Sequence, residues 1–132
     1  PSWLYEVKMG ATTVWERWNS VLPDGSISGT GMNSLNHYAY GSIVDWMYRN
    51  VCGLNPCEEA PGYKKAVIRP QPDPRIGKAE MKMHTASGLY ESAWYYEDGG
   101  IRFEITVPFD CEAVLILPDG REYQLTAGNY RF

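Results

Sequence analysis

A carboxylate between indole rings is the first feature of this sequence that suits catalysis. Within residues 10–18, Glu16 follows Trp15, precedes Arg17 and lies close to Trp18. A carboxylate can take a proton from attacking water in glycoside hydrolysis, and aromatic rings pack on the apolar faces of sugars. Arg17 would lower the pKa of Glu16 and keep it ionised, as a base requires. The spacing alone also fits a surface ion pair beside core tryptophans.

A histidine supplies a second polar side chain. His37 falls in the first turn of the strongest helical pattern of the chain, residues 34–52. The positive end of a helix dipole disfavours imidazolium, so we expect a neutral His37 that can hydrogen-bond sugar hydroxyls. A capping or core histidine is the alternative. His84 alternates with methionines in a strand pattern, and we expect it to face solvent or to be structural.

The elements that must position these residues change character near residue 55. Residues 2–9 read as a helix that ends at Gly10, and the Gly-, Ser- and Asn-rich residues 10–33 predict a long structured loop. The helix at 34–52 is apolar nearly all round, with Asn33 or Ser34 as its cap and Gly53 at its end. Such a helix should be buried on most sides, by a larger helical assembly, the C-terminal half or a second copy.

The second half of the sequence predicts strands. After a linker at 55–62, apolar and alternating runs occur at 63–69, 79–84, 89–96, 101–107, 113–117, 123–125 and 130–132, separated by turn residues. Short strands with regular turns indicate an antiparallel β-sandwich. The fold class predicted is therefore α+β, a short helical segment followed by an antiparallel β-sandwich, divided into residues 1–60 and 61–132.

Composition limits the function classes. The 132 residues carry a formal net charge of −4, which argues mildly against nucleic acid or a membrane as a partner. The chain begins with Pro1 and shows no signal sequence, so we expect an excised piece whose compartment, cytoplasmic, periplasmic or secreted, stays open. Three cysteines, Cys52, Cys57 and Cys111, lack the spacing of a zinc site, and we expect free thiols, no metal and no cofactor.

Four segments together resemble glycoside hydrolase family 78, the bacterial α-L-rhamnosidases. These are GATTVWERW at 10–18, SLNHYAYG at 34–41, PGYKK at 61–65 and ITVP at 105–108, so the resemblance covers essentially the whole chain. It implies that residues 1–60 are the last helices and the active-site loop of an (α/α)6 barrel, and that residues 61–132 are the C-terminal β-sandwich domain.

The resemblance also implies residue roles. Glu16 takes the position of the general base of an inverting reaction, His37 that of a residue lining the rhamnose pocket, and Trp15 and Trp18 those of pocket walls. The general acid lies upstream of this chain, so we expect the piece alone to be inactive and its substrate, a rhamnosylated oligosaccharide or glycoside, to need the missing N-terminal part. We also expect a homodimer of the isolated piece through residues 34–52.

A carbohydrate-binding or purely structural sandwich without catalysis is the competing interpretation. Tyr90, Trp94 and Tyr96 share one face of their strand and would form either a sugar platform or the core. A buried Trp94 together with a Glu16 that lines a cleft would favour the catalytic interpretation, whereas a Trp94 exposed on a flat face would favour the binding module.

Overall fold

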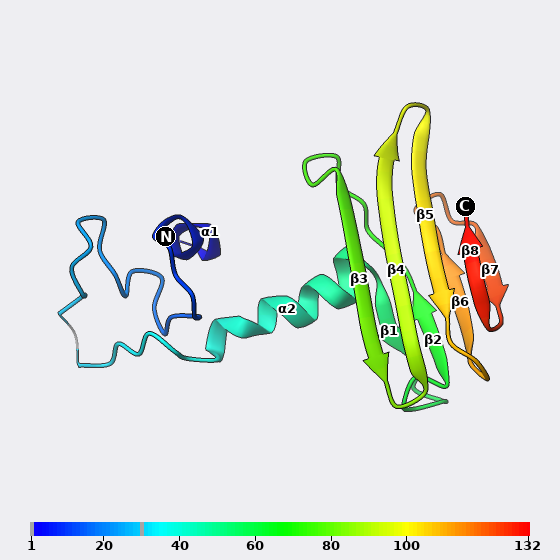
Figure 1. The fold of residues 1–132 in the computed structure, drawn as a ribbon, viewed down its shortest axis with the longest axis horizontal. Helices are drawn as coiled ribbons and strands as arrows, with labels where there is room; N and C mark the ends of the chain where they lie inside the picture. Colours follow the sequence, from blue (N-terminus) through cyan, green and yellow to red (C-terminus); the bar gives the residue numbers. More distant parts are fainter. Residues whose placement is uncertain (1, 30) are drawn as a thin grey trace. The chain divides into compact units, whose positions relative to one another are not determined.

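The computed structural model describes residues 2–29 and 31–132, which form two compact units, Pro1–Val44 and Asp45–Phe132 (Figure 1). The first unit holds the helix α1 (Trp3–Lys8), and the second holds the strands. None of the helices in the described residues is long and apolar enough to span a bilayer. Because the units are separate bodies, we describe each by itself.

The first unit is mostly irregular chain. α1 ends as the sequence predicts, with Gly10 in the left-handed region at φ 78° and its N–H bonded to the carbonyl of Val7. The loop that follows turns back on itself at the isolated bridge between Val21 and Ile27. Asp24 accepts the N–H of Ser26 and fixes the tip of this turn.

The helix predicted at 34–52 begins later, at Ala39. It consists of three consecutive pieces, η1 (Ala39–Ser42), α2 (Ile43–Trp46) and η2 (Met47–Val51), drawn as one coil in Figure 1. The prediction of caps at Asn33 and Ser34 was wrong, because the backbone around Ser34 pairs with the loop at residues 13–16 instead of starting a helix. Long-range pairing has overridden local propensity here.

Gly53 ends this helix, as predicted. Its φ is 82°, and a Cβ at this position would lie 2.1 Å from the backbone carbon of Arg69. The N–H of Arg69 donates to the carbonyl of Gly53 at 2.8 Å, so the chain leaves the helix directly beside the backbone of Arg69. Only glycine fits both the backbone conformation and the close approach.

The second unit contains two four-stranded sheets. The first runs in the order β1-β2-β6-β7 and the second in the order β3-β4-β5-β8. All neighbours pair antiparallel except β2 and β6, which are parallel, so the predicted antiparallel sandwich is confirmed with one mixed sheet. The strands are β1 (Leu54–Pro56), β2 (Lys65–Ile68), β3 (Lys78–Thr85), β4 (Gly88–Glu97), β5 (Gly100–Val107), β6 (Glu112–Ile116), β7 (Glu122–Leu125) and β8 (Gly128–Arg131).

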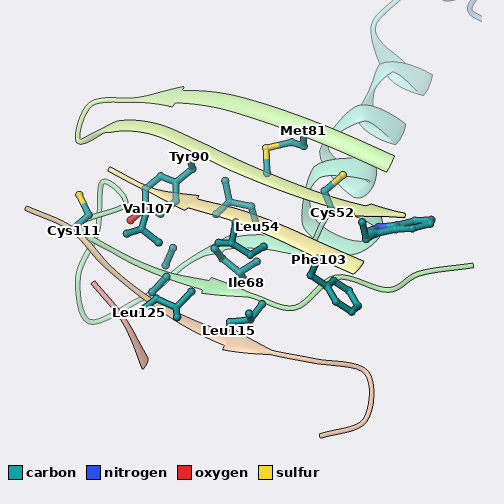
Figure 2. Packing of buried hydrophobic residues seen from close by; sticks show 14 of the residues in the cluster. Cys52, Leu54, Ile68, Met81, Tyr90, Phe103, Val107, Cys111, Leu115 and Leu125 are labelled. Carbon is teal, nitrogen blue, oxygen red and sulfur yellow. The ribbon is translucent and has the colours of Figure 1, made fainter. Parts of the chain in front are cut away.

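The hydrophobic core lies between the two sheets (Figure 2). Alternate residues of each strand point inward, so Tyr90, Ser92 and Trp94 of β4 are fully buried while their neighbours face out. The first sheet contributes Leu54 and Leu115 to the same core, and both are at most 1% exposed. Burying this much aliphatic and aromatic surface is the main force that holds the sheets together.

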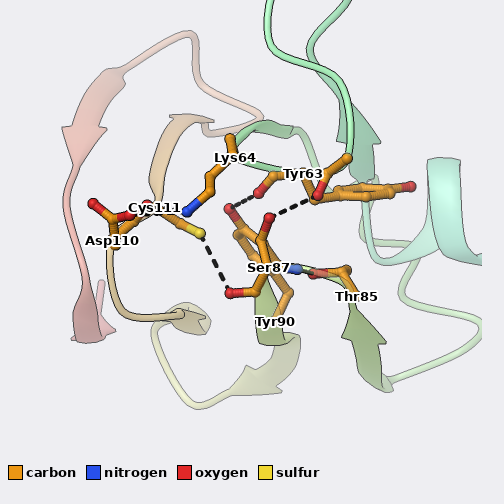
Figure 3. A network of polar contacts seen from close by, with 8 residues as sticks. Tyr63, Lys64, Thr85, Ser87, Tyr90, Asp110 and Cys111 are labelled. Carbon is orange, nitrogen blue, oxygen red and sulfur yellow. Dashed lines mark hydrogen bonds and ion pairs between the residues drawn. The ribbon is translucent and has the colours of Figure 1, made fainter.

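A polar network closes one end of the sandwich (Figure 3). The hydroxyl of Tyr90 donates to the carbonyl of Tyr63 at 2.9 Å, and the Ser87 hydroxyl donates to the carbonyl of Gly62 at 2.8 Å. The Cys111 thiol donates to the carbonyl of Ser87 at 3.6 Å. Burial raises the pKa of Tyr90, which keeps its hydroxyl protonated as a donor. Each donor satisfies a backbone carbonyl, so the network ties connecting segments together and is structural.

Candidate active-site loop

The structure brings the two candidate motifs of the first unit, around Glu16 and around His37, into direct contact. The N–H of Glu16 donates to the carbonyl of Ser34 at 2.9 Å, and the N–H of His37 donates to the carbonyl of Val14 at 2.8 Å. The hydroxyl of Thr13 donates to the carbonyl of Leu35. Residues 13–16 and 34–37 therefore run side by side, although nearly twenty positions separate them in the sequence.

The Glu16 carboxylate is held by the backbone of the partner segment. Its Oε2 atom accepts the N–H of Ser34 at 2.7 Å, a short, charge-assisted distance. Ser34 thus makes two hydrogen bonds to Glu16, one to its backbone N–H and one to its carboxylate. The side chain is half-buried, so this bond fixes one oxygen of a carboxylate that stays partly exposed to solvent.

His37 lies before the helix, and the prediction that it occupies the first helical turn was wrong. Its Nδ1 atom accepts the N–H of Ala39, the first residue of η1, at 3.2 Å. A ring that accepts at Nδ1 carries its proton on Nε2, so Nε2 is the donor of the neutral form. The ring is half-buried and stacks on Tyr38, with centroids 5.5 Å apart.

The two tryptophans anchor the loop. Trp15 is only 4% exposed and meets the ring of Tyr5 edge to face. Trp18 is half-buried, stacks on Tyr40 at a centroid distance of 3.8 Å and meets Trp3 edge to face at 4.8 Å. These contacts tie the loop to α1 and to η1, so the indole rings fix the backbone that carries Glu16.

Two further residues shape this loop in ways that the sequence did not predict. The side-chain amide of Asn33 donates to the carbonyls of Ser20 and Ser28, each at 3.1 Å, and braces the turn between them. Glu6 on α1 is 5% exposed, and its Oε2 atom accepts the N–H of Trp15 at 3.4 Å. The sequence suggested Asn33 only as a helix cap and gave no role to Glu6, because each acts on a backbone group distant in the chain.

The competing sugar platform on the sandwich is contradicted by the structure. Tyr90 and Trp94 are 0% exposed and belong to the core, and only Tyr96, at 39%, reaches the surface. The inner face of β4 packs against the first sheet, which leaves no flat aromatic surface there. Within residues 2–29 and 31–132, no three His, Cys, Asp or Glu side chains gather as they would around a metal ion.

Comparison with known proteins bears on both units. Residues 1–51 match the bacterial α-L-rhamnosidase 6-hairpin glycosidase domain, and residues 53–132 match the bacterial α-L-rhamnosidase C-terminal domain. The chain belongs to the bacterial α-L-rhamnosidase family. This membership confirms the resemblance that the motifs around Glu16 and His37 indicate.

Individual relatives agree with this membership. An α-L-rhamnosidase of Alteromonas sp. (strain LOR) is 44% identical over 118 residues, which are 89% of this chain and 13% of that protein. The crystal structure of native α-L-rhamnosidase from Aspergillus terreus matches the whole chain with a TM-score of 0.90 at 38% identity. That of Streptomyces avermitilis α-L-rhamnosidase complexed with L-rhamnose also matches it with a TM-score of 0.90, at 34% identity. The chain covers 15% and 14% of those two structures, respectively.

Proposed function

We propose that this chain is the C-terminal part of an inverting α-L-rhamnosidase, and that Glu16 is its general base. The pairing of residues 13–16 with 34–37 carries the proposal, because it sets the carboxylate of Glu16 and the ring of His37 on one short stretch of paired backbone. The family membership and the α-L-rhamnosidase activity for which the relatives are named support the substrate class, terminal α-L-rhamnosyl residues of glycosides.

In this mechanism Glu16 activates water. The Ser34 N–H holds Oε2 at 2.7 Å, so Oε1 takes the proton as the water oxygen attacks the anomeric carbon. An acid elsewhere in the full-length enzyme protonates the departing oxygen from the opposite side of the sugar, about 6.5–9.5 Å from the base. One carboxylate cannot do both at once, so we propose that the 132-residue piece by itself does not turn over a nitrophenyl rhamnoside.

The remaining site residues take supporting roles in this proposal. His37 donates from Nε2 to a sugar hydroxyl, since its Nδ1 is occupied by Ala39. Trp18 offers its partly exposed indole as a wall beside the sugar. Trp15, which we expected to be a second wall, is buried, and we propose that it supports the backbone beneath Glu16.

The Glu16→Gln substitution in the full-length enzyme tests the proposal. Glutamine keeps an oxygen for the Ser34 N–H but cannot accept the proton of water, so kcat should fall by about 10²–10⁴-fold with little loss of stability. Asp24→Asn is the matched control, because it removes a carboxylate from an exposed turn of the same unit. Normal turnover by Glu16→Gln would remove Glu16 from the role of base.

The domain boundary and the dimerisation of the isolated piece also remain proposals. We place the boundary between the catalytic piece and the sandwich domain near residue 52, ahead of the expected division at 60 and 61, because β1 (Leu54–Pro56) pairs with β2 in the first sheet.

We also propose that the isolated piece dimerises through residues 34–52, where Val44, Trp46 and Met47 are about half exposed. A monomer by light scattering at high concentration would contradict the dimer.

A further inference from the structure

Glu6 is a buried carboxylate that the proposed mechanism does not use. It lies on α1 and is 5% exposed. Its Oε2 atom accepts the N–H of Trp15, and its Oε1 atom has no hydrogen-bond partner among residues 2–29 and 31–132. Burying a carboxylate with incomplete hydrogen bonding is costly, so a residue of this kind calls for a reason beyond packing.

The backbone of Glu6 holds the same loop as its side chain. The carbonyl of Glu6 accepts the N–H of Ala11 at 3.0 Å, while its carboxylate accepts the N–H of Trp15 at 3.4 Å. Glu6 of α1 therefore accepts hydrogen bonds from both ends of the segment 11–15. The neighbouring Tyr5 adds a bond from its hydroxyl to the carbonyl of Val21 at 2.8 Å.

Two consecutive N–H groups at the end of this segment are bonded to different elements. The N–H of Trp15 donates to Glu6 on α1, and the N–H of Glu16 donates to the carbonyl of Ser34 on the paired segment. Glu6 and Ser34 belong to different segments of the chain, so residues 15 and 16 are held between two separate acceptors. Ser34 also holds the carboxylate of Glu16, and Glu6 holds the backbone N–H of the residue before it.

We propose that Glu6 is a positioning residue for the general base: its carboxylate fixes the backbone of Trp15 and thereby the place of the Glu16 carboxylate. This inference rests on the proposed function, in which Glu16 activates water. An apolar side chain at this position would leave the buried Trp15 N–H without an acceptor, and the loop would relax to find one. A displacement of about 1 Å at a reacting group can cost roughly 10²-fold in rate.

Two substitutions of Glu6 in the full-length enzyme separate positioning from packing. Glu6→Gln keeps an oxygen that accepts the Trp15 N–H, and we expect kcat within about threefold of the wild type. Glu6→Met fills similar volume without an acceptor, and we expect kcat to fall by about 10- to 100-fold with KM within about twofold. Asp24→Asn again serves as the control, and the melting temperature of each variant is measured alongside. Unchanged kcat in Glu6→Met would overturn the proposal, as would equal losses in both Glu6 variants.

A double substitution shows whether Glu6 acts through Glu16. In Glu16→Ala, azide can replace the activated water: its nitrogen bonds to the anomeric carbon as the bond to the leaving oxygen breaks, and the enzyme's acid protonates that oxygen. If Glu6 positions Glu16, adding Glu6→Met to Glu16→Ala should leave the azide-dependent rate within about twofold, because the group it positions is gone. A further loss as large as in the wild-type background would mean a general structural role and would overturn the inference.

The same measurements keep the two proposals apart. Full activity of Glu16→Ala without azide contradicts the role of Glu16 as base, and with it any action of Glu6 through that base. An inactive, azide-rescued Glu16→Ala together with a normal Glu6→Met keeps the base and removes only the positioning role of Glu6.

Discussion

Trp94 offers a sharp test of how the helix is joined to the sandwich. Its indole Nε1 donates to the carbonyl of Val51 at 2.7 Å, and the hydroxyl of Ser92 donates to the carbonyl of Cys52 at 2.6 Å. Val51 is the last residue of η2, where a helix leaves carbonyls without partners in its own backbone. Two inward-facing side chains of β4 therefore complete the end of the helix, and Trp94→Phe removes one of the two donors.

The expected loss follows from what phenylalanine lacks. A carbonyl left without its donor in a buried place costs about 1–3 kcal/mol. The smaller ring also leaves a void where Trp94 is 0% exposed, which adds about 1 kcal/mol. We expect the free energy of unfolding to fall by about 2–4 kcal/mol, and the melting temperature by about 10–25 °C for a unit of this size.

Urea unfolding of the 132-residue chain, followed by far-ultraviolet circular dichroism, measures the loss. Tyr96→Phe is the control, because Tyr96 is 39% exposed and its ring contact with Trp94 survives; it should change stability by less than about 0.5 kcal/mol. Ser92→Ala should cost about 1–3 kcal/mol by the same reasoning as the lost donor. An unchanged unfolding free energy in Trp94→Phe would refute the capping role and the core assignment together.

Two further predictions concern residues at the end of the helix and in the linker. Gly53→Ala should cost about 2–5 kcal/mol in the same urea assay, because φ is 82° and the new Cβ would lie 2.1 Å from the backbone of Arg69. Iodoacetamide at pH 8 should label the half-buried Cys57 and spare Cys52 until urea is added, as read by mass spectrometry, since burial raises the pKa of Cys52 to about 11. The folded state favours the neutral thiol of Cys52 more than the unfolded state does. The contribution of this thiol to the free energy of unfolding is therefore fully present below pH 9.0 and is lost as the pH rises through about 11.

The sandwich was largely predictable because its strands follow a local rule. Alternation in runs such as 101–107 assigns one face to the core, and turn residues bound each run, so the structure contains a strand in every predicted run. The parallel pairing of β2 with β6 was not predictable, since it depends on which edges meet in space. The same holds for β1, in which Asn55 and Pro56 fall in the predicted linker and become strand only through pairing with β2.

The candidate site divides in the same way. The sequence by itself determined which residues we propose to carry the chemistry, Glu16 and His37, because their types and their motifs are local properties. It placed His37 wrongly in a helix, since the bonds that hold residues 34–37 beside residues 13–16 join positions far apart in the chain. Only the tertiary structure decided which groups hold this segment: the N–H of Ser34 bonds the Glu16 carboxylate, and the buried Glu6 accepts the N–H of Trp15. A hydrogen bond between distant segments leaves no trace in local spacing.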